Sequence, residues 1–350
     1  MKNNIGVLLP VSALPGGQGI GDFGYDCYQY LDWLSKHHYR YWQILPLNPL
    51  GEGNSPYMSI CSKAIDIRYI SLEIIYKEDG LLDELPEYRK GATKVNYQAV
   101  YNFKIKWLKK AFIAYSKTGM DGLKKFKTKN PWVSEYATYL VFKKINKNKC
   151  WNEWDEKYIN YFDSHNNPPK SLIKQIDFIC FMQYMAFKQW KHVMAYDKAK
   201  RIKIIADMPF YVGFDSADCW LHRDQFEIDE NYNPTLVAGV PPDYFSEEGQ
   251  LWGQPIYNFK KMKENNYRVE KDSIGAKDVP SSAYYGVQTL RAAENFHITG
   301  LNMHPEIINS LAYIKKAAAI TNCEVGLLNK KIGKAIVQAC DEILEGKFRE

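Results

Sequence analysis

The chain has 350 residues, of which 46% are hydrophobic and 25% charged, and its formal net charge is +6. This balance is typical of a globular protein and excludes an intrinsically disordered chain. No apolar run approaches the roughly 20 residues of a membrane span, and the excess lysines are spread over helix-like segments, so we expect neither a membrane nor a nucleic-acid partner.

The start of the chain carries one lysine and then runs into prolines and glycines. It lacks the continuous apolar stretch of a secretory signal, which predicts a cytoplasmic protein. The seven cysteines are widely spaced and contain no Cys-x-x-Cys pair, so we expect no metal site and reduced, mostly buried thiols.

Three short apolar runs predict buried strands, at residues 5–9, 41–47 and 202–208. Between the first two, Cys27, Tyr30, Leu31 and Leu34 have helical spacing, and Asp22 is placed to cap that helix. A strand-helix-strand unit of this kind predicts a parallel sheet and hence an α/β protein.

About 150 residues with helical periodicity separate the second strand from the third, too many for one crossover. We interpret residues of about 66–200 as a mainly helical insertion. The sequence pattern changes after residue 267. Two helical segments are expected there, one marked by Ile307 and Leu311 and one by Ile332 and Ile336. No strand-like run accompanies them.

Two groups of residues could carry chemistry near the predicted strand ends. Asn54-Ser55-Pro56-Tyr57 follows the second strand, and taken alone it could be a simple loop. Asp207 ends the third strand and opens the run Asp207-Met208-Pro209-Phe210-Tyr211. A carboxylate in this place points toward the active-site face of a barrel fold, although an aspartate here could equally cap a helix.

The third group is the longest, Ala238 to Ser246 followed by Gly249-Gln250-Leu251-Trp252-Gly253. Two adjacent prolines stiffen the loop, and its tyrosine, phenylalanine and tryptophan rings offer flat faces beside polar side chains. A polyhydroxylated sugar ring requires this combination. A loop so rich in aromatic residues would be costly to expose without a binding role.

In this order and spacing the three groups resemble the N-terminal part of the 4-alpha-glucanotransferases (amylomaltases) of the alpha-amylase superfamily, over residues 1–267. The resemblance implies an incomplete (β/α)8 barrel of about three strands. It also implies a retaining double displacement on alpha-1,4-glucans or maltooligosaccharides without a cofactor. The residues expected to contact sugar are Ser55, Tyr57, Asp207, Asp243, Tyr244, Phe245, Gln250 and Trp252.

The family's nucleophile motif, Arg-x-Asp-His-Phe-Arg, and its acid/base motif, Ala-Glu-Asp-Leu-Gly, occur nowhere in the chain. No catalytic residue is therefore assigned. Residues 268–350 instead resemble the opening of aspartate ammonia-lyase, of the aspartase/fumarase superfamily, through Val279-Pro280-Ser281-Ser282 and the following residues up to Phe296.

Three hypotheses follow from the two resemblances: a glucanotransferase, an aspartate ammonia-lyase, and an inert fusion that at most binds glucan. Three of eight strands cannot close a barrel, so the third strand would keep an open edge. We therefore expect non-specific self-association.

Overall fold

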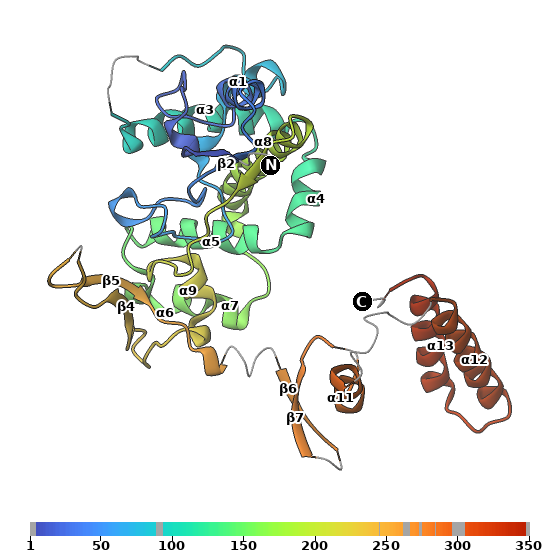
Figure 1. The fold of residues 1–350 in the computed structure, drawn as a ribbon. Coiled ribbons are helices and arrows are strands. Elements are labelled where there is room, and N and C mark those ends of the chain that lie inside the picture. Colours follow the sequence, from blue (N-terminus) through green and yellow to red (C-terminus); the bar gives the residue numbers. More distant parts are fainter. Residues whose placement is uncertain are drawn as a thin grey trace. The chain divides into compact units, whose positions relative to one another are not determined.

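The computed structural model describes residues 5–88, 94–244, 246–261, 267–272, 275–283, 285–295 and 305–347. The chain divides into two compact units, Met1–Asn265 and Asn266–Glu350. Figure 1 shows the elements of both.

The strands are β1 Gly6–Leu8, β2 Tyr41–Gln43, β3 Lys203–Ile205, β4 Val237–Val240, β5 Gln250–Pro255, β6 Tyr267–Asp272 and β7 Gly275–Pro280. The helices of the first unit are α1 Tyr25–Lys36, α2 Leu72–Lys77, α3 Tyr97–Ser116, α4 Asp121–Lys129, α5 Trp132–Ile145, α6 Glu156–Ile159, α7 Tyr161–Ser164, α8 Ile173–Ala199 and α9 Ala217–Leu221. Those of the second unit are α11 Val287–Asn295, α12 Pro305–Glu324 and α13 Lys330–Leu344.

The first unit contains a three-stranded parallel sheet in the order β1-β2-β3. Gly6 pairs with Tyr41, and Tyr41 in turn with Lys203, so the prediction of parallel strands is confirmed. The strands are shorter than the apolar runs that predict them. Pro10 and Pro46 lie just beyond β1 and β2, and proline has no N–H for the sheet ladder.

Helix α1 packs its apolar face against the sheet, with Cys27, Leu31 and Leu34 fully buried as their spacing predicts. The predicted cap is wrong. Gly24 occupies the N-cap position, and no side chain caps the helix. The Asp22 carboxylate instead accepts hydrogen bonds from the Gly24 N–H at 2.9 Å and from Lys104 Nζ at 2.8 Å. The aspartate pairs with a buried lysine that is distant in sequence.

The segment between β2 and β3 is mainly helical, as its periodicity predicts. Its longest helix, α8, anchors the extended stretch that leads into α2. Gln183 bonds both the N–H and the carbonyl of Ile65, at 2.9 and 2.8 Å. Gln189 bonds the same two groups of Ser71, at 2.8 and 3.0 Å. Buried main-chain groups that lack a partner strand are satisfied in this way by helix side chains.

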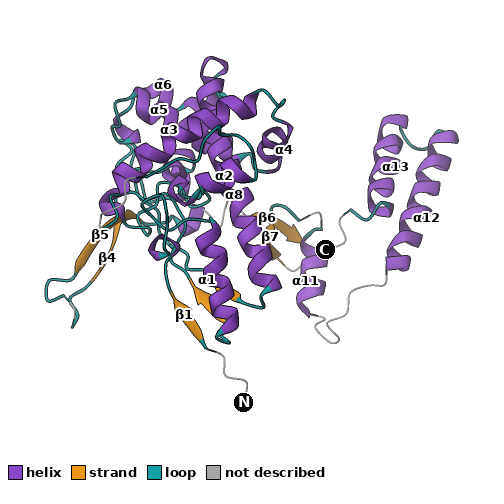
Figure 2. Cartoon of the chain, turned by 90° about the horizontal axis from the view of Figure 1, so that it is seen from above, coloured by secondary structure: helices purple, strands orange, loops and turns teal. Residues whose placement is uncertain are grey.

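The second unit contains the two predicted helices, α12 and α13, which lie side by side (Figure 2). Lys316 and Asp341 join them by an ion pair of 2.5 Å. The expectation of no strand in this region is wrong, because β6 and β7 form an antiparallel hairpin. The half-buried face of β6 carries charged side chains, among them Arg268 and Glu270, which bond each other at 2.8 Å. Hydrophobic alternation therefore could not reveal this strand.

Candidate functional site

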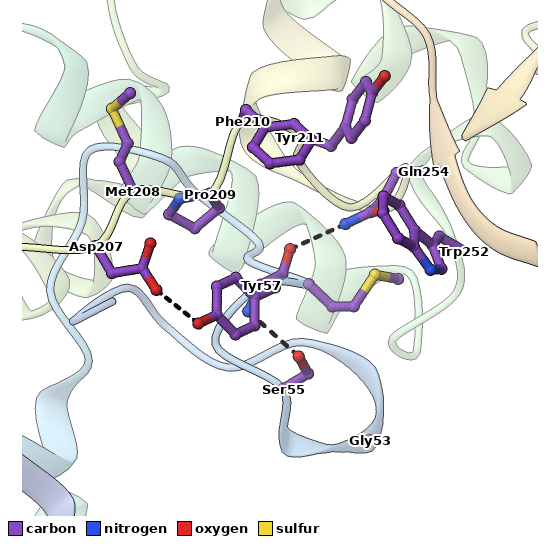
Figure 3. A pocket seen from close by; sticks show the side chains of 11 residues that line it. Gly53, Ser55, Tyr57, Asp207, Met208, Pro209, Phe210, Tyr211, Trp252 and Gln254 are labelled. Atoms are coloured by element: carbon purple, nitrogen blue, oxygen red, sulfur yellow. Dashed lines mark hydrogen bonds between the residues drawn. The ribbon is translucent and has the colours of Figure 1, made fainter. Parts of the chain in front are cut away.

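A cavity of about 670 Å³ opens where the chain leaves β2 and β3. Three segments of the first unit supply its walls: the loop after β2, the loop after β3, and strand β5 (Figure 3). It is lined by Gly53, Ser55, Tyr57, Met58, Asp207, Met208, Pro209, Phe210, Tyr211, Trp252 and Gln254. The carboxyl ends of parallel strands are the usual place for a binding site in an α/β fold.

The hydroxyl of Tyr57 donates a hydrogen bond of 2.6 Å to Asp207 Oδ2. This bond joins the loops that follow the neighbouring strands β2 and β3. This bond to a carboxylate raises the pKa of Tyr57, with a smaller contribution from burial. The tyrosine therefore stays a neutral donor. Tyr57 as a residue remains 42% exposed, which leaves room for a flat ligand to stack on its ring.

The loops after β2 and β3 are fastened to each other beneath the cavity. Ser62 donates to both carboxylate oxygens of Asp218, from its main-chain nitrogen at 2.9 Å and from its hydroxyl at 2.5 Å. The N–H of Gly213 donates to the carbonyl of Ser59 at 3.0 Å, and that of Ala217 to Ile60 at 2.9 Å. These bonds hold Tyr57 and Asp207 in register without any ligand.

The helical insertion supports the loop after β3 from outside. Asp215 accepts a hydrogen bond of 2.7 Å from the hydroxyl of Tyr139 on α5 and forms an ion pair with Lys143. The indole N–H of Trp151 donates to the carbonyl of Phe214 at 2.7 Å. The insertion thus has a clear structural effect on the cavity wall, although its pattern alone carried no sign of one.

The long aromatic motif forms the hairpin of β4 and β5, which extends away from the helices of its unit (Figure 1). Trp252 lines the cavity, and its indole N–H donates to Gln250 Oε1 at 3.1 Å. Asp243 and Tyr244 lie in the turn of the hairpin, and neither lines the cavity. Tyr244 is 96% exposed.

Of the eight residues expected to contact sugar, the cavity brings together Ser55, Tyr57, Asp207 and Trp252. Gln250 does not line the cavity, but its side chain accepts a hydrogen bond from Trp252, which does. Asp243 and Tyr244 do not line the cavity. Phe245 lies outside the described residues.

Sequence reasoning missed several lining residues. Met208, Phe210 and Tyr211 belong to the motif that begins with Asp207, so lining positions could have been sought there. Gln254 carried no comparable signal. Its side chain donates to the main-chain carbonyl of Tyr57 at 3.0 Å, a contact that only the tertiary structure creates.

The cavity offers aromatic faces beside hydrogen-bonding groups, a combination suited to a sugar chain. Asp207 is the one carboxylate among the described residues that line it. A retaining glycoside transfer uses two, about 5 Å apart. Within the described residues no group of three histidine, cysteine, aspartate or glutamate side chains could hold a metal ion. In the same part of the chain, every helix is too short or too polar for a membrane span.

Comparison with known proteins gives two family matches. Residues 9–278 match the model of a family described as 4-alpha-glucanotransferase, and residues 275–350 match one described as lyase. The chain is 35% identical over 278 residues to the 4-alpha-glucanotransferase of Streptococcus pneumoniae serotype 4, covering 76% of this chain and 54% of that protein. Identity to the enzyme of Aquifex aeolicus is 36% over 270 residues, again covering 54% of that protein.

The chain therefore spans about half the length of these curated relatives. Among solved structures, an amylomaltase from Streptococcus agalactiae in complex with acarbose aligns with a TM-score of 0.70 at 26% identity, over 84% of this chain and 72% of that one. The fold is thus amylomaltase-like. On the match to residues 9–278, this chain belongs to the 4-alpha-glucanotransferase family.

Proposed function

We propose that the cavity between the two strand-end loops and β5 binds alpha-1,4-glucan chains, as part of a site of the 4-alpha-glucanotransferase type. The observation that carries the proposal is the hydrogen bond between the Tyr57 hydroxyl and Asp207, which holds the partly exposed Tyr57 in place. Trp252 lines the same cavity. This arrangement suits a glucose ring, because its apolar face can stack on the aromatic ring while its hydroxyl groups donate hydrogen bonds to the carboxylate.

The architecture we propose is an incomplete (β/α)8 barrel over residues 1–267, joined to an aspartase-like segment over 268–350. The parallel order β1-β2-β3 and the helical insertion between β2 and β3 support the first part. The lyase-family match supports the second. A cytoplasmic location belongs to the same proposal and is tested by cell fractionation.

We further propose that this 350-residue polypeptide binds glucan without transferring it. Neither the family's nucleophile motif nor its acid/base motif occurs in the sequence. Among the described residues that line the cavity, Asp207 is the one carboxylate. Retention by double displacement needs a nucleophile and a separate acid/base.

Isothermal titration with maltoheptaose tests binding. We expect saturable binding that falls at least fivefold in affinity in Trp252→Ala, since aromatic stacking contributes about 1 kcal/mol or more beyond area burial. Leu251→Ala is the matched control, because Leu251 is 81% exposed on the same strand and does not line the cavity. Equal affinity of Trp252→Ala and the unmodified chain would contradict the proposal.

Incubation with maltotriose, followed by chromatography of the products, tests transfer. We expect no oligomers longer than maltotriose, and no more glucose than in a sample without protein. A complete family enzyme is the positive control. Elongated products would show that this polypeptide is catalytically competent. The lyase-family match favours one further assay, in which absorbance of fumarate is followed from aspartate, and there we also expect no product.

A further inference from the structure

Strand β5 is irregular where it passes the cavity. Val237 pairs with Pro255, and Gly239 pairs with Leu251, so two steps along β4 oppose four steps along β5. The extra residues form a bulge at 252–254, in which Gly253 has a φ of 74°. A regular strand alternates its side chains between two faces, whereas a bulge bends the strand and turns them. Trp252 and Gln254, on either side of this glycine, both line the cavity.

Gln254 is only 6% exposed, and its Nε2 donates to the carbonyl of Tyr57 at 3.0 Å. Two other groups of Tyr57 are also bonded. Its main-chain N–H donates to Ser55 Oγ at 3.3 Å, and its hydroxyl donates to Asp207 at 2.6 Å. Tyr57 is therefore held from three directions, and Gln254 provides the bond that comes from the hairpin (Figure 3).

We propose that Gln254 is a positioning residue for glucan binding, because it ties the bulged strand to Tyr57 and so holds the rings of Tyr57 and Trp252 at a fixed separation. The inference rests on the proposed glucan site. Two rings that are already in place when the sugar arrives save the entropy of ordering them on binding. Without the bond, the hairpin that carries Trp252 would lose this attachment to the loop after β2.

The substitution Gln254→Glu tests the bond with almost no change of shape. At pH 7.5 the carboxylate cannot donate, and it faces a carbonyl oxygen. Burial raises the pKa of a carboxyl group, which favours its protonation at pH 5, and the protonated hydroxyl can donate to that carbonyl again. We expect affinity for maltoheptaose to fall about tenfold at pH 7.5 and to return to within about twofold of the unmodified chain at pH 5.

Other titratable groups line the same cavity, namely Tyr57, Asp207 and Tyr211. The measured quantity is therefore the ratio of the two dissociation constants at each pH, in which any pH effect common to both chains cancels. Gln175→Glu on α8 is the control for added charge, since Gln175 is exposed and away from the cavity, and its ratio should stay near one.

Gly253→Ala tests the bulge separately. An added Cβ would meet no atom within 4 Å, so its effect is confined to the left-handed backbone, which costs a residue other than glycine about 1 kcal/mol. We expect weaker binding at both pH values with no recovery at pH 5. Recovery in Gln254→Glu alone would therefore report the hydrogen bond.

A measurement without sugar separates this inference from the proposed function. Trp252 fluorescence, taken as the difference from Trp252→Phe, should shift to longer wavelength in Gln254→Glu at pH 7.5 and return at pH 5. A chain that never binds maltoheptaose but shows this shift refutes the glucan site and retains the positioning of Trp252. Unchanged fluorescence, or equal affinity of Gln254→Glu at pH 7.5, overturns the role of Gln254.

Discussion

Single buried polar residues carry much of the specificity of this fold. Lys104 is fully buried, and its ammonium donates to Asp22 at 2.8 Å and to the carbonyls of Arg68 and Ile70 at 2.6 and 2.7 Å. All three of its protons are satisfied. Burial nevertheless lowers the pKa of Lys104, with the Asp22 carboxylate acting in the opposite direction.

Removal of one partner should therefore cost more than removal of both. We expect Lys104→Met to lower the free energy of unfolding by about 3–5 kcal/mol, because it leaves the Asp22 carboxylate buried without a cation. The double variant with Asp22→Asn should recover part of this loss. Urea unfolding followed by circular dichroism measures both, and a single variant within about 1 kcal/mol of the unmodified chain would contradict the role of the pair.

The buried thiols make stability depend on alkaline pH. Burial raises the pKa of Cys61 and of Cys180 to about 12, from 9.0. Between these values the unfolded chain releases the thiol protons and the folded chain retains them, so stability is present below pH 9 and is lost as the pH rises above it. From pH 8 to pH 10 each thiol should cost about 1.3 kcal/mol.

Urea unfolding at both pH values checks this sign. In the variant Cys61→Ala with Cys180→Ala, the drop in unfolding free energy between pH 8 and pH 10 should be about 2.6 kcal/mol smaller. Cavities left by the alanines lower stability equally at both pH values and cancel in the difference. An identical drop in the variant would exclude these thiols as its source.

At the scale of elements, α8 acts as a support for extended chain. Gln183 satisfies both main-chain groups of Ile65, and all of these atoms are buried. Gln183→Leu would leave a buried N–H and a buried carbonyl unpaired, each costing about 1–3 kcal/mol. We expect a total loss of about 2–6 kcal/mol in unfolding free energy.

The matched control is Gln175→Leu on the same helix, where the side chain is exposed and the change should stay within about 0.5 kcal/mol. Similar losses for the two variants would mean that helix propensity or added apolar surface, and not the bonds to Ile65, dominates. Thermal unfolding of both proteins in parallel makes the comparison.

Elements differed in how far the sequence could predict them. The helical spacing of apolar residues identified α1, α12 and α13, and in α1 three of these residues are fully buried. The hairpin of β6 and β7 escaped notice because its half-buried face is bonded through Arg268, which reaches the carbonyls of Pro280 and Ala283 at 2.8 Å. A polar face carries no hydrophobic signal.

At the scale of the whole molecule, the three-stranded parallel sheet leaves apolar side chains exposed on its outer strands. Leu8 on β1 is 56% exposed and Ile205 on β3 is 44% exposed, and these two strands are the edges of the sheet. Apolar edge strands pair readily with other chains. We therefore expect concentration-dependent self-association of this polypeptide.

Sedimentation velocity over a range of concentrations measures this association. Ile205→Lys should reduce it by placing a charge at the edge, whereas Leu251→Lys on the β4–β5 hairpin, also an exposed apolar position, should leave it unchanged. A monomer at every concentration with a sharp cooperative melt would contradict the expectation.

The sequence by itself determined the family, the parallel strand-helix-strand start and the segments from which the cavity is built, because local periodicity and motif order are written along the chain. The tertiary structure alone decided which side chains meet. The bond from Gln254 to Tyr57 and the pair of Lys104 with Asp22 join residues 197 and 82 positions apart. Such contacts depend on packing, and no local pattern encodes them.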